Sequence, residues 1–158
     1  MFHFELYLGM KPVRDDWTAL ENHYLKLLRP YAKVNLTHWE EKVHASVKKN
    51  PLVGAEKQLL SLKKILHPRA CLIACSEEGE MMSSKNFSHF LQQQANLGQS
   101  QFGFILGGAF GLKEETKKLC SFCFSFSPMT LPHRLAQVLL LEQLYRSMTL
   151  QQGKIYHY

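Results

Sequence analysis

The sequence predicts an α/β fold in which a mostly parallel sheet is flanked by helices. Strand-like and helix-like patterns alternate along the 158 residues, as they do where crossover helices join parallel strands. Two of the strand-like runs, residues 70–75 and 101–106, are mostly apolar, which is typical of strands buried on both faces of a sheet. No internal repeat, low-complexity tract or Pro/Gly-rich linker interrupts the chain. We therefore expect one domain over residues 1–158.

The first half of the chain supplies two strands and two helices. Residues 2–8 are expected to form the first strand, and the helix after it begins at the capping pair Asp15-Asp16 and ends at a proline. Residues 33–39 alternate in polarity and form the second strand, and residues 54–66 form the next helix. The apolar residues of the first helix recur at helical spacing; they are Trp17, Leu20, Tyr24, Leu27 and Leu28.

The second half continues the alternation with three strands and three helices. Ser83-Ser84 cap a helix that stops at Gly98, and residues 113–119 form a short helix. The last helix, residues 132–148, is apolar over far more than one stripe. It therefore needs neighbours on all sides, from its own chain or from a second subunit. The three strands are expected at residues 70–75, 101–106 and 122–126.

The chain is basic, with 19 Lys+Arg, 13 Asp+Glu, a formal net charge of +6 and a pI near 9.2. A basic field favours a polyanion such as RNA, or an anionic membrane surface. It is equally typical of a solvated helix face, so charge alone does not decide the function. The excess lies mainly in the first half and includes Lys48, Lys49, Lys57, Lys63, Lys64 and Arg69.

Signals for membrane insertion, secretion and metal binding are weak. No stretch approaches the ~20 apolar residues of a membrane-spanning helix, and the start of the chain does not match a signal peptide. We therefore expect a cytoplasmic protein with no membrane contact. Cys120 and Cys123 could indicate zinc or redox chemistry, but zinc would need two further ligands at suitable spacing. We interpret these two residues, together with Cys71 and Cys75, as small buried thiols and expect no metal.

Three ends of the predicted strands have unusual sequences. In an open parallel sheet, ligands collect at the carboxyl ends of the strands. The first such end is residues 76–79, the second is the glycine-containing run 107–111, and the third is residues 126–133, which lead directly into the last helix. Glycines let the backbone approach a ligand closely. The run is neither GxGxxG nor a phosphate-binding P-loop, so these ends predict a ligand pocket of a different kind.

Four motifs give the chain a specific resemblance. They are GGAFG at 107–111, FSFSPMTLPH at 124–133, LEQLYR at 141–146 and Tyr156-His157 near the C-terminus. In order and spacing they resemble the signature of the RlmH family, and weaker similarity covers nearly the whole chain. Members of this family are SPOUT-type enzymes that use S-adenosyl-L-methionine (SAM) to methylate N3 of a pseudouridine in the large-subunit (23S) ribosomal RNA.

The resemblance implies a SPOUT-type fold with a C-terminal trefoil knot, a homodimer, and a bent SAM molecule in the knot. The three loops that would hold SAM coincide with the three strand ends described above. The residues that the resemblance assigns to SAM are Cys75, Gly107, Phe126, Ser127, Pro128, Met129, Thr130 and Leu131.

The resemblance also implies residues that act on the RNA. Methyl transfer to the ring nitrogen requires alignment of the two reactants and loss of the proton from N3. His133, Tyr156 and His157 are the catalytic candidates, and the tail of one subunit is expected to complete the active site of the other. Arg146 and Arg134 are the candidates for contacts with RNA, and Arg146 is also a candidate for holding the tail.

Several positions depart from the family pattern. Glu80 stands where the family often has Lys, Gln137 where it often has Arg, and Tyr158 where relatives usually end in a basic residue. Two alternatives therefore stay open: a catalytically weakened SAM-binding protein associated with the ribosome, and a SPOUT methyltransferase that acts on tRNA. Assembled ribosomes are the expected substrate, because recognition by a small domain depends on the shape of the target.

Overall fold

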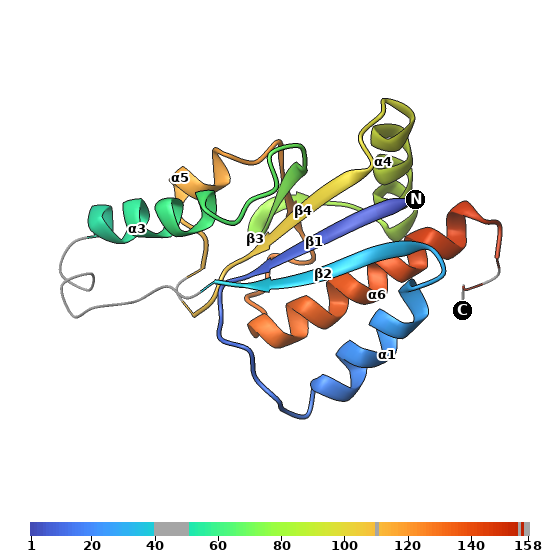
Figure 1. Cartoon of the computed structure of the whole chain (residues 1–158), viewed down its shortest axis with the longest axis horizontal. Helices are drawn as coiled ribbons and strands as arrows, with labels where there is room; N and C mark the ends of the chain where they lie inside the picture. The colour runs from blue at the N-terminus through green and yellow to red at the C-terminus, as the bar shows by residue number, and fades with distance from the viewer. Residues whose placement is uncertain (40–50, 110, 155, 157–158) are drawn as a thin grey trace.

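A computed structural model describes residues 1–39, 51–109, 111–154 and 156 of the chain. The described strands form one parallel sheet with the order β2-β1-β4-β3-β5 (Figure 1). This confirms the predicted fold class; the C-terminal trefoil knot stays a prediction. The strands are β1 (Phe2–Leu8), β2 (Ala32–His38), β3 (Cys71–Met81), β4 (Gln101–Leu106) and β5 (Phe122–Ser125). The helices are α1 (Thr18–Leu28), α3 (Pro51–Lys63), α4 (Ser84–Asn96), α5 (Glu114–Lys117) and α6 (His133–Gln151).

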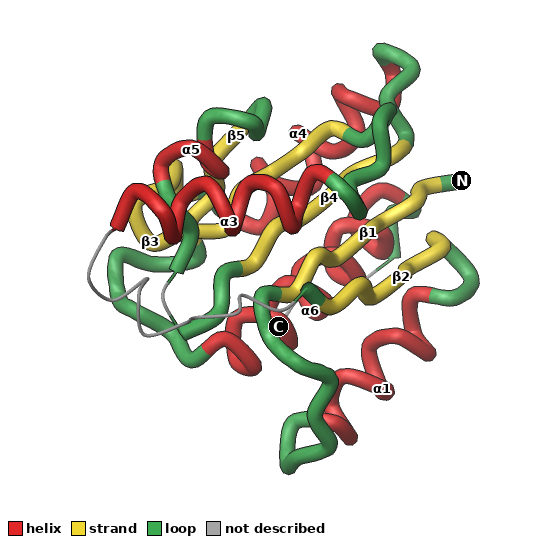
Figure 2. Tube along the Cα trace, turned by 60° about the vertical axis from the view of Figure 1, so that its left-hand side comes forward, coloured by secondary structure: helices red, strands yellow, loops and turns green. Residues whose placement is uncertain are grey.

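The helices lie in two layers, one on each face of the sheet. α1, α4 and α6 cover one face, and α3 and α5 cover the other (Figures 1 and 2). Alternate residues of β1 show why: Phe4 and Leu6 belong to the larger apolar core, whereas Tyr7 belongs to a smaller core with Leu62 of α3. Because successive side chains of a strand point to opposite faces, each central strand is buried on both sides.

α6 has its neighbours within the chain. It packs against α1 and α4 and against the sheet through β4, and nine of its 19 residues are buried. The apolar pattern of this helix left open whether its own chain or a second subunit covers it. The contacts of α1 and α4 show that much of the covering comes from its own chain. In the described part of the chain, no helix meets the length and apolarity that crossing a membrane requires.

The start of α1 differs from the expected capping pair. The helix begins at Thr18, and Asp15 lies one turn before it. The Asp15 carboxylate accepts from the Trp17 backbone N–H at 3.1 Å and from the Thr18 hydroxyl at 3.3 Å. By contrast, the start of α4 is as predicted, because the Ser83 hydroxyl accepts from the Asn86 N–H.

β3 is longer than its apolar run indicated. The sequence predicted a strand at 70–75 and a loop after it, but β3 continues to Met81 with an irregularity between Cys75 and Glu80. Beyond the irregularity, Glu80 pairs with Phe124 of the edge strand β5. Gly79 permits this pairing, since a Cβ there would lie only 2.6 Å from the Phe124 carbonyl carbon. Glu77 and Glu78 are exposed, so an apolar run could not indicate this part of the strand.

Candidate functional site

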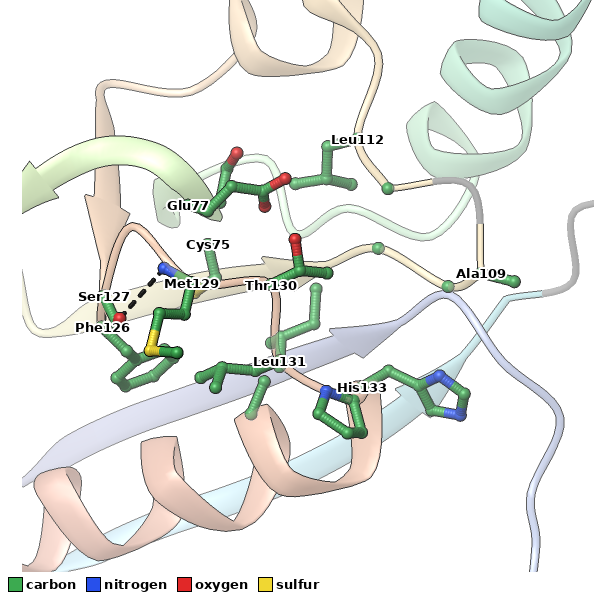
Figure 3. Close-up of a pocket in the computed structure, with 17 residues that line it drawn as sticks. Cys75, Glu77, Ala109, Leu112, Phe126, Ser127, Met129, Thr130, Leu131 and His133 are labelled. Atoms are coloured by element: carbon green, nitrogen blue, oxygen red, sulfur yellow. Dashed lines mark hydrogen bonds between the residues drawn. The ribbon is translucent and has the colours of Figure 1, made fainter.

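A pocket of about 600 Å³ lies at the carboxyl ends of the central strands. Its volume falls within the range of small-molecule sites. Three segments form most of the wall: the middle of β3 at residues 75–77, the turn after β4 at residues 106–112, and the loop 126–133 that enters α6. They overlap the three segments that the sequence singled out, 76–79, 107–111 and 126–133, although the first lies within β3 and not at its end. In Figure 3, Glu77 and Leu112 lie on one side of Thr130 and His133 lies on the other.

Glycine is required in the turn after β4 because the end of β1 passes directly beside it. A Cβ on Gly108 would lie 2.0 Å from the Gly9 carbonyl oxygen, and one on Gly107 would lie 2.6 Å from the Gly111 carbonyl carbon. Gly111 itself has φ +65°, a conformation that favours glycine. Its N–H donates to the Gly108 carbonyl at 3.0 Å and closes the turn. Backbone therefore forms this wall of the pocket.

The loop between β5 and α6 is fixed by two serines. The buried Ser125 hydroxyl accepts from the Ser127 N–H at 3.2 Å and lies 2.9 Å from the Ser127 carbonyl and 3.2 Å from the Glu77 carbonyl. The Ser127 hydroxyl accepts from the Met129 N–H at 3.0 Å (Figure 3). Ser125 thus ties the loop to β3. Ser125 was not among the site residues predicted from the sequence, although its place at the end of a strand that leads into the loop was a usable signal.

Seven of the eight residues assigned to SAM from the sequence line the pocket. Pro128 does not line it and is exposed on the loop. Leu112 and Ala136 also line the wall but were not predicted from the sequence. Glu77 lines it too and lies within the predicted segment 76–79, although it was not assigned to SAM. The seven are Cys75, Gly107, Phe126, Ser127, Met129, Thr130 and Leu131.

Two of the catalytic candidates, His133 and Tyr156, lie at opposite ends of α6. His133 is the first residue of α6 and lines the pocket. Tyr156 follows the other end of that helix. The 19 residues of α6 span about 28 Å at about 1.5 Å per residue. His157 lies outside the described residues.

Arg146 holds Tyr156 near the C-terminal end of α6. Its Nη1 donates to the Tyr156 carbonyl at 2.9 Å, and its guanidinium lies 4.8 Å from the centre of the Tyr156 ring. Glu142 accepts from the same guanidinium, and Tyr145 packs edge-on against Tyr156 at 4.9 Å. Burial, together with the nearby Tyr24 and Glu142, raises the pKa of the Tyr156 phenol, so the phenol is protonated at neutral pH.

Arg134 is in a position that does not fit the predicted contact with RNA. Its side chain is 7% exposed and donates to both oxygens of Asp15 at 2.9 Å and to Glu21 at 2.5 Å. It also donates to Gln137, which in turn donates to Glu21. The reason is the packing of α6 on α1, which points the first turn of α6 at these carboxylates. Hydrogen bonds from Arg134 hold the pKa of the Asp15 carboxyl below its ordinary value.

The four cysteines are partly buried free thiols. Burial raises the pKa of Cys75, and it raises that of Cys120 to about 12, so neither is a thiolate at neutral pH. Among the described residues, no group of His, Cys, Asp and Glu is arranged to hold a metal ion.

The class of site follows from these features. A pocket at the carboxyl ends of a parallel sheet, with a glycine turn on one wall and apolar side chains on another, is typical of α/β domains that bind a nucleotide-like molecule.

Comparisons with known proteins give the family. The family model described as "Predicted SPOUT methyltransferase" matches residues 3–157. The chain belongs to the SPOUT methyltransferase family.

Two curated relatives and one solved structure agree with this assignment. The chain is 38% identical over 164 residues to the "Ribosomal RNA large subunit methyltransferase H" of Pelotomaculum thermopropionicum, with 100% of both chains covered. It is 37% identical over 136 residues to the protein of the same name from Bacillus thuringiensis subsp. konkukian, covering 85% of this chain and 86% of that one. The structure of "Probable Methyltransferase from Bordetella pertussis Tohama I" has a TM-score of 0.54 at 11% identity, with 93% of each chain covered, and shows the fold alone.

Proposed function

We propose that the chain transfers a methyl group from SAM to N3 of a pseudouridine in 23S ribosomal RNA. The observation that carries the proposal is the full-length similarity to proteins named as large-subunit ribosomal RNA methyltransferases, together with the pocket at the three strand ends. The chain is an enzyme of that class. The choice of pseudouridine N3 rests on the resemblance carried by the motifs at 107–111, 124–133, 141–146 and 156–157. The choice of assembled ribosomes rests on the expectation that a small domain recognises the shape of its target.

The pocket fits SAM in size and in the chemistry of its wall. Its glycine turn exposes backbone groups to a ligand, and Leu106, Phe126 and Leu131 offer apolar surface. Glu77 adds a carboxylate and Thr130 a hydroxyl, which suit the hydroxyl and ammonium groups of such a ligand. When bound, SAM supplies an electrophilic methyl group on a sulfonium. The protein positions the two reactants and excludes water around them.

The acceptor side of the active site is proposed to form between two subunits. His133 reaches the pocket from its own chain, whereas Tyr156 lies beside the far end of α6. In a homodimer, Tyr156 and His157 of one chain would complete the acceptor side of the other chain's active site, next to its SAM pocket. The protonated Tyr156 phenol can donate a hydrogen bond to an anion that develops on the pyrimidine ring. Arg146 then acts by holding the tail rather than by binding RNA.

The RNA-docking surface is proposed to include the outer face of α3. Lys57 and Lys63 are exposed on α3, and Lys64 and Arg69 are exposed in the segment after it. These cations suit the phosphate backbone, which supplies most of the affinity of a non-specific contact. α3 is bonded to the glycine-turn segment of the pocket through Gln58, so RNA on this face would lie near the site. A protein that modifies ribosomal RNA is expected to work in the cytoplasm.

The test is transfer of labelled methyl from SAM to ribosomes that lack the modification, followed by mapping of the labelled nucleotide. Label at N3 of a pseudouridine in 23S RNA is the expected result. Label on tRNA alone would show that the substrate is tRNA and not ribosomal RNA. No label on ribosomes, free ribosomal RNA or tRNA, with SAM binding intact, would contradict the proposed activity and leave a SAM-binding protein associated with the ribosome.

A further inference from the structure

Gln58 is a fully buried amide on an otherwise apolar face of α3. Its exposed fraction is 0%, equal to that of Leu62 and close to the 5% of Ala55. These three residues share a face by helical spacing, and Leu62 belongs to the core beneath α3. Burial of an amide is unfavourable unless its polar atoms find partners. The partners of Gln58 therefore indicate why the residue is there.

The Gln58 amide bonds to residues 111–116, the segment that runs from the pocket turn into α5. Its Oε1 accepts from the Lys113 backbone N–H at 2.8 Å and from the Thr116 hydroxyl at 2.7 Å. Its Nε2 donates to the Gly111 carbonyl oxygen at 3.2 Å. The exposed fraction of Thr116 is also 0%. One side chain thus holds three points of the same short segment, all more than fifty residues away along the chain.

That segment forms part of the pocket wall. Gly111 and Leu112 line the pocket, whereas Gln58 does not. On the opposite side of the same turn, Gly108 is pressed against the end of β1. The turn is therefore fixed on one side by backbone packing and on the other by Gln58. Removal of the amide would leave the Gly111 carbonyl and the Lys113 N–H without this partner and would free the turn to shift.

We propose that Gln58 is a positioning residue for SAM, which acts through the glycine turn and touches neither SAM nor RNA. The inference rests on the proposed function only for the identity of the ligand. Because the turn belongs to the SAM side of the site, loss of the amide weakens SAM binding. The docking of ribosomes and the chemical step at saturating SAM are left nearly unchanged.

The first variant is Gln58→Met, which keeps the volume of the side chain and removes its hydrogen bonds. We expect the Kd and KM for SAM to rise about tenfold, a change typical of leaving buried backbone groups unsatisfied. The KM for ribosomes and kcat are expected to stay within about twofold. Kd is measured by isothermal titration of the full chain with SAM, and the kinetic constants by methyl incorporation.

The second variant, Gln58→Glu, separates positioning from a general loss of stability. An ionised carboxylate still accepts from Lys113 and Thr116 but cannot donate to the Gly111 carbonyl. Protonation restores the donor, and burial favours the protonated form. The affinity of Gln58→Glu for SAM should therefore approach that of the wild type as the pH falls, with both proteins measured at each pH.

Leu91→Ala is the matched control. Leu91 is fully buried in α4, on the other face of the sheet, so its truncation destabilises the fold without touching the turn. It should keep wild-type SAM affinity. The proposal is overturned if Gln58→Met binds SAM as the wild type does, or if Leu91→Ala loses as much SAM affinity as Gln58→Met. Failure of the wild-type protein to bind SAM would instead overturn the proposed function.

Discussion

The two ends of α6 are built in different ways. At its N-terminal end the helix meets a pocket whose walls come from β3, the glycine turn and the loop 126–133 of the same chain. At its C-terminal end, Arg146 and Tyr145 hold Tyr156 against the helix, and Tyr156 does not line that pocket. One chain therefore supplies the walls of the pocket but keeps apart two of the residues predicted for catalysis, His133 and Tyr156. In the proposed homodimer, these two residues would meet across two chains.

The largest effect is expected from a substitution in the glycine turn that forms one wall of the pocket. Gly108→Ala would place a methyl group 2.0 Å from the Gly9 carbonyl oxygen, so the turn must move and SAM affinity should fall by at least about 100-fold. Calorimetric titration with SAM measures this. The control is Gly98→Ala, since Gly98 has φ +87° and open space around it. That variant should lose about 1 kcal/mol of stability and keep its SAM affinity. If Gly108→Ala and Gly98→Ala bound SAM with equal affinity, the glycine turn would not be part of the site.

At the tail end, Tyr156→Phe removes only the phenolic hydroxyl. We expect kcat for methyl transfer to ribosomes to fall about 100-fold, the size of effect typical of a lost group that stabilises charge or moves a proton. SAM affinity should be unchanged, because Tyr156 does not line the pocket. Single-turnover methyl incorporation at saturating SAM is the measurement. A loss of SAM affinity equal to the loss of rate would contradict the separation of the two ends.

A smaller effect is expected from the outer face of α3. Changing Lys57, Lys63 and Lys64 to Gln removes three exposed cations. The KM for ribosomes should rise about tenfold. The slope of log KM against the logarithm of salt concentration should fall by about three, one for each lost cation. SAM affinity should not change. Changing Lys26, Arg29 and Lys85 to Gln is the matched control, because these three cations are exposed elsewhere on the protein. An equal rise in the KM for ribosomes in that control would exclude a specific docking face.

The smallest effect concerns stability near the pocket end. Arg134 holds the pKa of Asp15 below its ordinary value of 3.8. The ion pair therefore stabilises the fold above that value, and this contribution is lost as the pH falls through the lowered pKa. Asp15→Asn should be less stable than the wild type in urea at pH 7, and the difference should shrink below pH ~3.8. In an Arg134→Met background the Asp15→Asn change should have little effect at either pH. A difference that persists at low pH would contradict this account.

Local patterns predicted the elements of this fold because periodicity and capping act over a few residues. Ser83 caps α4 as expected, and the apolar run of β4 is buried on both faces. The extension of β3 past Cys75 could not be read in the same way. Exposed glutamates interrupt its apolar pattern, and the pairing of Glu80 depends on the distant Phe124.

The pocket was predictable in outline and the networks around it were not. Strand ends and glycines are visible in the sequence, so the segments 75–77, 106–112 and 126–133 could be expected to meet. From the sequence, Arg134 was a candidate for contact with RNA. Its partner Asp15 lies 119 residues away along the chain, so no local pattern could indicate the ion pair. Gln58 likewise carries no local signal, since its partners lie 53 to 58 residues further along the chain.

The most direct test of the shared active site combines the two ends in one dimer. Gly108→Ala and Tyr156→Phe chains, each inactive alone, are co-expressed with different affinity tags and purified over both, so that only mixed dimers remain. One pocket in each mixed dimer is intact and faces an intact tail from the other chain, so about half of the wild-type rate of methyl transfer is expected. A mixed dimer no more active than its parents, or a preparation that yields no mixed dimer, would contradict the account.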